Sequence, residues 1–319
     1  MRKTVLMLAM AVMTFSFVAC GSKSSDSAKE ETKQESTTRV VTDASNHEVT
    51  IPTNPERIVD LSGTSDILNV LGFNIVGTCN SDAYDNTKFP TYLEDALKDA
   101  KILGYSMSDT VDVESIITLN PDLIVISKVQ EANYDKLAKI APTIVVNPTQ
   151  VDFRQDFRDI AKIMDKEEEG EKWLASYDEQ AKEVSALMKE KLGEDSSYLC
   201  FLASNGSNFI LADAALGSVL YDDLGVTRPE ALPKQDNMEL PVVSNEGLAE
   251  FDADYLFLVA TDDDLAKLQK DAVYKNLKAV KEGNVIVLPA SPYFNQGYSP
   301  IGRLAFIEEL KTFVAQLSE

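Results

Sequence analysis

In the first third of the chain, short apolar runs typical of strands alternate with segments that have the apolar spacing of helices. The predicted elements are a strand at 57–61, a helix from Ile67 that stops at Gly72, a strand at 75–77, a helix at 111–119 and a strand at 123–126. Buried strands that alternate with helices are typical of a parallel sheet covered by helices on both faces. The pattern therefore predicts an α/β lobe.

A long helical stretch follows at 167–192, which lacks proline. Its apolar residues recur in steps of four, four, three and four and so share one helical face; they are Trp173, Tyr177, Ala181, Val184 and Met188. A helix of this length spans about 39 Å, which is enough to connect two lobes. The alternative is an ordinary amphipathic helix within one domain.

The strand and helix pattern then returns. The elements expected after the long helix are a strand at 198–202, helices at 215–224 and 246–251, and a strand at 255–259. Both halves contain a glutamate that is followed eight residues later by an aspartate and then by an apolar strand. The pairs are Glu114 with Asp122 and Glu246 with Asp254. Two similar lobes joined by a stiff helix leave a cleft, and such sheets bind ligands at the carboxyl ends of their strands.

The amino terminus has the layout of a bacterial export signal. Arg2 and Lys3 precede an uncharged apolar run that ends before Cys20, the predicted lipidated cysteine, although Phe17 stands where leucine is usual. The alternative is a membrane-spanning helix, but the run has about 15 residues where a span needs roughly 20. The predicted organisation is a signal peptide at 1–19, a flexible tether at 20–38, an N-terminal lobe at 39–166, the connecting helix at 167–192 and a C-terminal lobe at 193–319.

Charge and composition exclude several classes of function. The net charge of −22 makes nucleic acid an unfavourable partner. His47 is the single histidine, so a site for a bare transition metal and histidine-dependent catalysis are both disfavoured. We therefore expect a protein that is not an enzyme and holds no resident cofactor, although hydrolysis by paired carboxylates stays open. Cys79 and Cys200 are interpreted as free thiols.

Four ordered segments resemble one family. RIVDLSGTSDILNVLG, VESIITLNPDLIVIS, VVSNEGLAEFDADYLFL and YKNLKAVKEGNVIVLP are similar to the iron-siderophore, haem and cobalamin group of binding proteins of ABC importers, over about residues 39 to 317. The resemblance implies two Rossmann-like lobes joined by one backbone helix, a limited hinge motion, and a monomer that delivers its ligand to a permease dimer with its ATPase. Glu114 and Glu246 match the positions that dock on permease arginines; the alternative is that both cap or solvate helices.

The resemblance implies an iron complex as ligand but leaves its chemistry open. Met107 matches a methionine that is an axial ligand of the haem iron in the haem branch. That branch takes its second axial ligand from a histidine, and the corresponding stretch here, 259–262, has none. Lys128 and Arg228 favour an anionic catecholate, while asparagine and tyrosine favour a neutral hydroxamate. Cobalamin, an adhesin or sensor, and an enzyme on this scaffold are further alternatives. The expected ligand contacts are Tyr84, Tyr105, Met107, Lys128, Asn205, Arg228, Tyr293, Asn295 and Tyr298.

Overall fold

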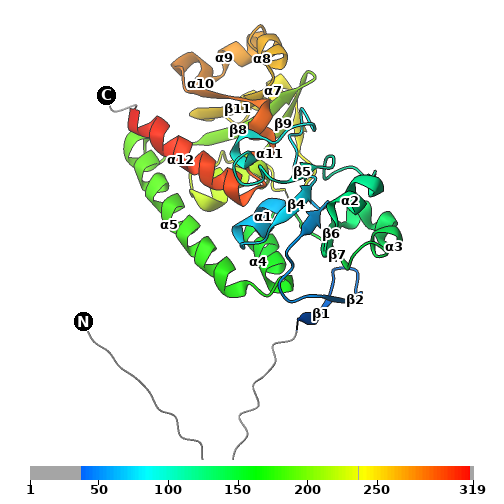
Figure 1. The fold of residues 1–319 in the computed structure, drawn as a ribbon. Coiled ribbons are helices and arrows are strands. Elements are labelled where there is room, and N and C mark those ends of the chain that lie inside the picture. Colours follow the sequence, from blue (N-terminus) through cyan, green and yellow to red (C-terminus); the bar gives the residue numbers. More distant parts are fainter. Residues whose placement is uncertain (1–36, 236, 317–319) are drawn as a thin grey trace, which may run out of the picture. The chain divides into compact units, whose positions relative to one another are not determined.

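A computed structural model of the protein describes residues 37–235 and 237–316. They form one compact unit that contains two five-stranded sheets and one long helix (Figure 1). The predicted signal peptide, Cys20 and nearly all of the predicted tether lie outside the described residues. Thr38, which we placed in the tether, instead begins the antiparallel hairpin of β1 (Thr38–Thr42) and β2 (Glu48–Pro52).

The N-terminal lobe contains a wholly parallel sheet with the strand order β5-β4-β3-β6-β7. Nearly all side chains of its central strands are buried, because helices cover both faces. The strands are β3 (Ile58–Asp60), β4 (Ile75–Thr78), β5 (Lys101–Ile102), β6 (Leu123–Ser127) and β7 (Thr143–Val146). The helices are α1 (Ser65–Val70), α2 (Val113–Leu119), α3 (Tyr134–Leu137) and α4 (Phe153–Ile163), with 3-10 turns η1 (Thr91–Leu93) and η2 (Lys128–Asn133).

The C-terminal lobe contains a mixed sheet with the order β10-β9-β8-β11-β12. Strands β8, β11 and β12 are parallel, as expected, whereas β9 runs antiparallel to β8. The cause is the turn at Asn205 and Gly206, where both residues have positive φ values of 51° and 80°, as a tight hairpin requires. The strands are β8 (Tyr198–Ser204), β9 (Ser207–Ile210), β10 (Val242–Val243), β11 (Tyr255–Ala260) and β12 (Val285–Pro289).

The helices of the C-terminal lobe are short except for the last one. The predicted helix at 215–224 is α6 (Ala215–Ser218) continued by one π-helical turn, η3 (Val219–Asp223). The others are α7 (Asn245–Ala249), α8 (Asp262–Leu268), α9 (Ala272–Asn276), α10 (Lys278–Glu282), α11 (Ala290–Gln296) and α12 (Pro300–Gln316).

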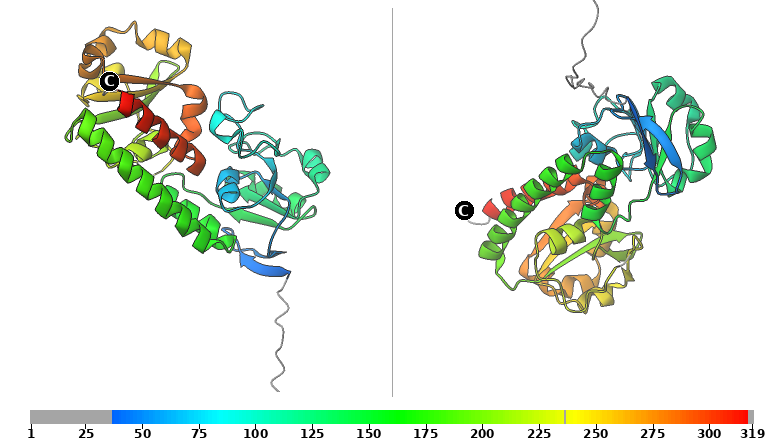
Figure 2. Two further views of the ribbon diagram at one scale, coloured as in Figure 1. Left: turned by 60° about the vertical axis from the view of Figure 1, so that its left-hand side comes forward. Right: turned by 90° about the horizontal axis from the view of Figure 1, so that it is seen from below.

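The connecting helix α5 (Glu167–Leu192) has the predicted bounds and connects the two lobes. Tyr177, Ala181, Val184 and Met188 of its predicted apolar face are buried, and Trp173 stacks on Tyr177 at a centroid distance of 5.3 Å. Helix α12 packs along α5 and also reaches α1 and η1 of the N-terminal lobe (Figure 2). The lobes are therefore joined by packing along two helices and not by one covalent connection alone.

The glutamate and aspartate repeat has a structural counterpart. The Asp122 carboxylate accepts hydrogen bonds from the Glu56 and Arg57 amides at 2.7 and 2.9 Å, just before β3. Asp254 accepts from the amide and the hydroxyl of Ser197 at 2.8 and 2.9 Å, just before β8. Each aspartate thus holds the start of the neighbouring strand, and the two halves share this construction.

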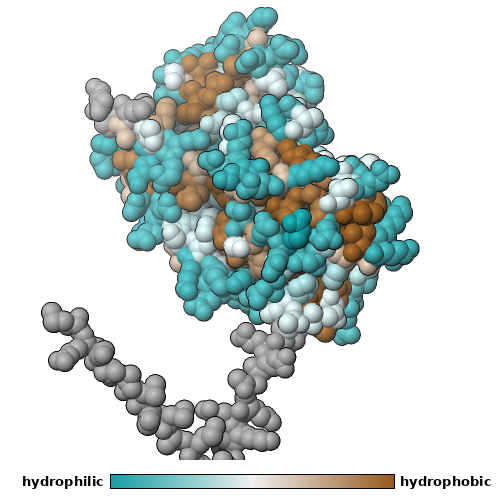
Figure 3. Space-filling view, viewed as in Figure 1, coloured by the Kyte–Doolittle hydropathy of each residue, from teal (hydrophilic) through white to brown (hydrophobic). Residues whose placement is uncertain are grey.

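Polar and charged residues cover most of the face shown in Figure 3, with smaller hydrophobic areas between them. This agrees with the high content of acidic residues. Among the helices that the structure describes, none has both the length and the apolar composition that a bilayer span requires.

Asp223 joins four helical elements at the lobe junction. Its carboxylate has no exposed surface and accepts hydrogen bonds from Arg154 of α4 and Arg303 of α12, each at 2.6 Å, and from the Tyr177 hydroxyl of α5. The Arg303 guanidinium also lies 4.3 Å from the centre of the Phe153 ring. A buried charge needs such partners, because desolvation without them costs several kcal/mol.

We predict that Asp223→Ala lowers the free energy of unfolding by about 3–5 kcal/mol, because it leaves the buried Arg303 without its carboxylate. Asp178→Ala is the matched control: it removes the other, half-exposed partner of Arg154 and should cost less than about 1 kcal/mol. Urea unfolding of both variants measures the difference. Equal losses would contradict the role given to Asp223.

Candidate ligand-binding cleft

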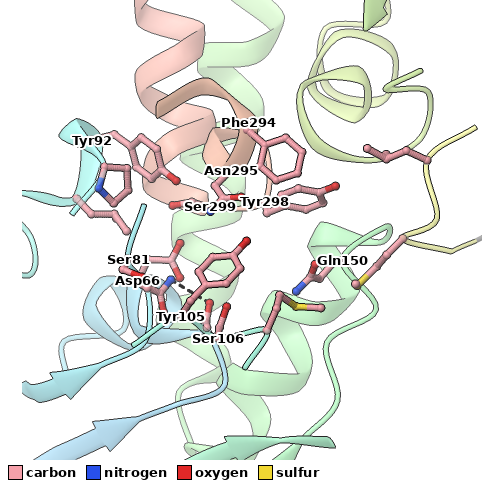
Figure 4. Close-up of a pocket in the computed structure, with 17 residues that line it drawn as sticks. Asp66, Ser81, Tyr92, Tyr105, Ser106, Gln150, Phe294, Asn295, Tyr298 and Ser299 are labelled. Carbon is pink, nitrogen blue, oxygen red and sulfur yellow. Dashed lines mark hydrogen bonds between the residues drawn. The ribbon is translucent and has the colours of Figure 1, made fainter. Parts of the chain in front are cut away.

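A cavity of about 190 Å³ lies between the two lobes (Figure 4). The N-terminal lobe lines it with segments that follow β3, β4, β5 and β7, at the carboxyl ends of the strands. The C-terminal lobe adds the end of α11, the turn between α11 and α12 and the segment before β10. This is the edge where parallel sheets place their ligand sites.

The turn between β3 and α1 forms the floor of the cavity. Asp60, buried at the end of β3, accepts hydrogen bonds from the hydroxyls of Ser62 and Ser65 at 2.5 and 2.6 Å and from the Thr64 amide at 3.0 Å. Burial raises the pKa of Asp60, and these hydrogen bonds oppose the shift. Asp60 thereby sets the shape of the turn that carries the lining residue Gly63 and leads into α1, where Asp66 lies.

Asp66 is the one acid among the described residues of the lining and is 2% exposed. Its Oδ1 accepts the Ile67 amide at 2.9 Å, and the Ser299 hydroxyl lies close to the carboxylate, but Oδ2 has no described partner in hydrogen-bond geometry. Burial raises the pKa of Asp66 to about 7; the nearby Ser299 hydroxyl opposes this shift and the Asp60 charge adds to it.

Aromatic and uncharged polar side chains form the walls. Tyr92 and Tyr105 come from the N-terminal lobe, and Phe294, Asn295 and Tyr298 from the other. Burial raises the pKa of Tyr298 to about 12 and also raises that of Tyr105, so both phenols stay protonated at neutral pH and can donate hydrogen bonds. Among the described residues that line the cavity there is no lysine, arginine or histidine.

Three contacts hold the lobes together beside the cavity. The Ser291 hydroxyl of α11 donates to Asp82 Oδ2 at 2.6 Å, and Asp82 is buried. Tyr84 and Phe294 meet edge to face with their ring centres 6.1 Å apart. A hydrogen bond between Asn295 and Tyr105 adds a third link.

Four of the predicted ligand contacts come together in the lining, namely Tyr105, Met107, Asn295 and Tyr298. Met107 is 45% exposed. Tyr84 lies next to the cavity, against Phe294, and is not part of the lining.

The two predicted basic ligand contacts, Lys128 and Arg228, bind other side chains outside the cavity lining. Lys128 Nζ donates to the Ser45 hydroxyl at 2.6 Å and to Glu131 at 3.1 Å, because the Ser127 cap starts a 3-10 turn that directs Lys128 toward the β1–β2 hairpin. Arg228 pairs with Asp213 at 2.7 Å, outside the cavity lining.

Asn205 and Tyr293 also lie outside the lining. Asn205 occupies the β8–β9 turn, where its backbone N–H donates to Asp264 at 3.1 Å. The Tyr293 hydroxyl donates to Glu309 of α12 at 2.7 Å. Ligand contact by Lys128, Arg228, Asn205 and Tyr293 therefore stays a prediction without support from the cavity.

Sequence reasoning missed several lining residues. Asp66 lies in a segment that resembles the family, where it could have been found as an acid that follows a strand at the sheet edge, and Phe294 stands between the predicted contacts Tyr293 and Asn295. Gln150 and Met238 come from irregular segments without periodicity, so no sequence signal marks them.

Glu114 and Glu246 have matching positions in the two lobes. Both are exposed, and each lies in the first turn of a short helix, α2 or α7. The caps of these helices are Asp112, which accepts the Ser115 amide, and Ser244, which accepts the Gly247 amide. The helices are thus capped without the two glutamates.

Comparisons with known proteins agree with this geometry. A family model described as periplasmic binding protein matches residues 62–292. The iron(3+)-hydroxamate-binding protein FhuD of Bacillus subtilis is 30% identical over 279 residues, which cover 84% of this chain and 85% of that protein. The probable siderophore-binding lipoprotein YfiY of the same organism is 33% identical over 303 residues, with 89% and 90% covered. The solved structure of the FhuD protein from S. pseudintermedius has a TM-score of 0.70 at 27% identity and covers 88% of this chain and 98% of its own.

We predict that Ser291→Ala lowers the free energy of unfolding by about 1–3 kcal/mol, because the buried Asp82 Oδ2 loses the hydroxyl that donates to it. Tyr293→Phe on the same helix removes a more exposed hydrogen bond and should cost less than about 1 kcal/mol. Urea unfolding compares the two variants. A hydrogen-exchange measurement should also show faster exchange at residues 82–85 in Ser291→Ala alone.

Proposed function

The chain belongs to the periplasmic binding protein family, and we propose that it captures a ferric hydroxamate siderophore between its lobes for delivery to an ABC importer. The observation that carries the ligand class is the chemistry of the cavity. Its walls are aromatic or uncharged and polar, with one buried acid and no basic side chain in the described lining.

Charge separates a hydroxamate from a catecholate. A ferric tris-catecholate is multiply anionic, and an unpaired charge in such a cleft is unfavourable by several kcal/mol at short range. A ferric trihydroxamate core is neutral, because three hydroxamate groups with one negative charge each balance the three positive charges of ferric iron. Tyr105, Asn295 and Tyr298 offer hydrogen-bond donors and ring faces to such a complex. The hydroxamate-binding name of the Bacillus relative supports the same class.

The cleft offers fewer suitable contacts to haem than to a hydroxamate complex. The haem branch needs a second axial ligand, and His47 stacks on Tyr134 at 4.3 Å and pairs with Asp43, away from the cavity lining. Haem propionates would also lack a basic partner in the described lining. The siderophore is therefore the ligand that the cavity supports best.

Capture requires the cleft to widen or the ligand to protrude from it. A cavity of about 190 Å³ is smaller than the roughly 300–1,000 Å³ of typical ligand pockets. Helix α5 and the buried Asp223 junction restrict the lobes to a modest hinge motion. The complex is bound and released without chemical change, and the iron enters as part of its chelate.

Delivery takes place outside the cytoplasm, with the protein attached to the membrane by a lipid on Cys20. Glu114 and Glu246 supply one exposed carboxylate on each lobe for arginines of the permease dimer. Two carboxylates held by a rigid pair of lobes define the orientation of docking.

We predict that the mature protein binds a neutral ferric trihydroxamate at least about tenfold more tightly than a ferric tris-catecholate or haemin. Quenching of tyrosine and tryptophan emission measures all three affinities. Tyr105→Ala should weaken hydroxamate binding at least about tenfold, because a wall of the cavity is lost. Lys128→Ala should leave it unchanged, because Lys128 contacts Ser45 and Glu131. Preference for the catecholate, with loss in Lys128→Ala, would refute the hydroxamate proposal.

We predict that Glu114→Lys combined with Glu246→Lys abolishes uptake of the iron complex by cells and leaves its dissociation constant unchanged, since both residues lie outside the cavity. Glu179→Lys with Glu190→Lys on α5 makes the same change in net charge on an exposed helix face and is the control. Normal uptake by the first double variant would show that docking uses other residues.

A further inference from the structure

The floor of the cavity continues into a smaller recess. The recess has a volume of about 50 Å³ and shares Gly63, Asp66, Gln150 and Tyr298 with the cavity. The residues that line the recess alone include Phe153 and Asp156 of α4. Asp66 therefore stands where the two spaces meet, and a group that enters the recess from the cavity passes its carboxylate.

The Asp66 carboxylate has fewer partners than the buried carboxylates of Asp60 and Asp223. Asp60 is surrounded by hydroxyls and amides, and Asp223 binds two guanidinium groups. Among the described residues, Asp66 is the acid that has a buried oxygen, Oδ2, without a hydrogen-bond partner. Burying a carboxylate oxygen without a partner is unfavourable, so a ligand that supplies one gains affinity.

None of the other charged or titratable groups described around Asp66 forms an ion pair with it, because most are acids or phenols and the Arg303 guanidinium pairs with Asp223. The Asp156 carboxylate accepts the Thr149 and Gln150 amides, and Asp82 accepts the Ser291 hydroxyl. Arg303 is bound to Asp223 and to the Ser218 hydroxyl. Among the described residues these groups are Asp60 before α1, Asp82 and Tyr92 after β4, Tyr105 after β5, Asp156 on α4, Tyr298 before α12 and Arg303 on α12.

We propose that Asp66 is the counter-ion for a protonated amine on the siderophore, so that the protein prefers ferric hydroxamates that carry an ammonium group over otherwise identical neutral ones. The inference rests on the proposed function and deepens it. A primary ammonium group at the end of an alkyl chain is small enough for the recess. It donates to the Oδ2 atom and meets the ring face of Tyr298, which attracts cations.

A water molecule is the competing occupant of the recess. Arg303 Nε is also buried without a partner and belongs to a residue that lines the same recess, so a water could bridge it to Asp66 Oδ2. In that case an ammonium group on the ligand would bring no gain in affinity. The two occupants thus differ in a measurable way.

The pH dependence of binding gives the proposal a second readout. Burial holds the pKa of Asp66 at about 7 in the empty cleft, and an adjacent ammonium group stabilises the carboxylate and lowers that pKa. The carboxylate form therefore binds the cationic ligand, and protonation competes with binding as the pH falls through about 7. Affinity for the ammonium ligand should drop roughly thirtyfold between pH 8 and pH 5.5, whereas affinity for a neutral ligand should stay nearly constant.

The test uses the ferric complex of desferrioxamine B, which has one free amine, and the same complex after N-acetylation, which removes the charge. Fluorescence titration at pH 8 should show at least about tenfold tighter binding of the amine form by the wild-type protein. Asp66→Asn should abolish both this preference and its pH dependence, so that the two complexes bind with equal affinity at each pH. Glu94→Gln, an exposed substitution outside the cavity lining, is the control and should behave like the wild type.

The outcomes separate this inference from the function on which it rests. If both complexes bind equally and without pH dependence, Asp66 is not the counter-ion, while hydroxamate capture stands. If neither complex binds, the proposed function fails and the inference fails with it. If Asp66→Asn does not fold, the comparison of the two complexes across pH with the wild-type protein still decides the matter.

Discussion

The buried carboxylate of Asp223 is the interaction on which the arrangement of the two lobes depends. It binds Arg154 of α4, Arg303 of α12 and the Tyr177 hydroxyl of α5, and it belongs to the C-terminal lobe. Asp223 and Arg303 are withdrawn from water, and Arg154 is the partner that comes from the N-terminal lobe, so separating the lobes at this point breaks its ion pair with Asp223. The relative position of the lobes, and with it the cleft, is set by this junction and by packing along α5 and α12.

The surface and the cleft both carry negative charge, whereas a typical anion-binding protein places positive charge at its site. The surface is strongly acidic, and the described cavity lining adds one further acid and no base. A negative field around a cleft attracts cations and repels anions, at a range limited by salt. A neutral or positively charged iron complex suits both regions, which connects the overall composition of the chain with the chemistry of the cavity.

Much of the architecture could be predicted because it depends on local periodicity. The face of α5 that contains Tyr177, Ala181 and Val184 is buried as its spacing indicates, and the parallel core strands are the uninterrupted apolar segments. The antiparallel β9 was missed although Asn205 and Gly206 carry a hairpin signal, because the short strand after them has little apolar pattern. Four lining residues were predicted from the resemblance to a family, and Gln150 and Met238 could not be, because irregular segments are positioned by what they pack against.

The sequence by itself determined the two α/β halves, the long helix between them and the acidic character of the chain, since these depend on residue spacing and composition. Only the tertiary structure decided which charges face the ligand. Lys128 and Arg228 follow the right elements in the chain, yet Ser45, Glu131 and Asp213 hold their side chains away from the cavity lining. Asp66, an ordinary acid in the sequence, becomes distinctive because folding buries its carboxylate at the cavity floor and leaves one oxygen without a partner. Burial and pairing are properties of neighbours brought together from distant parts of the chain, and a pattern of nearby residues does not contain them.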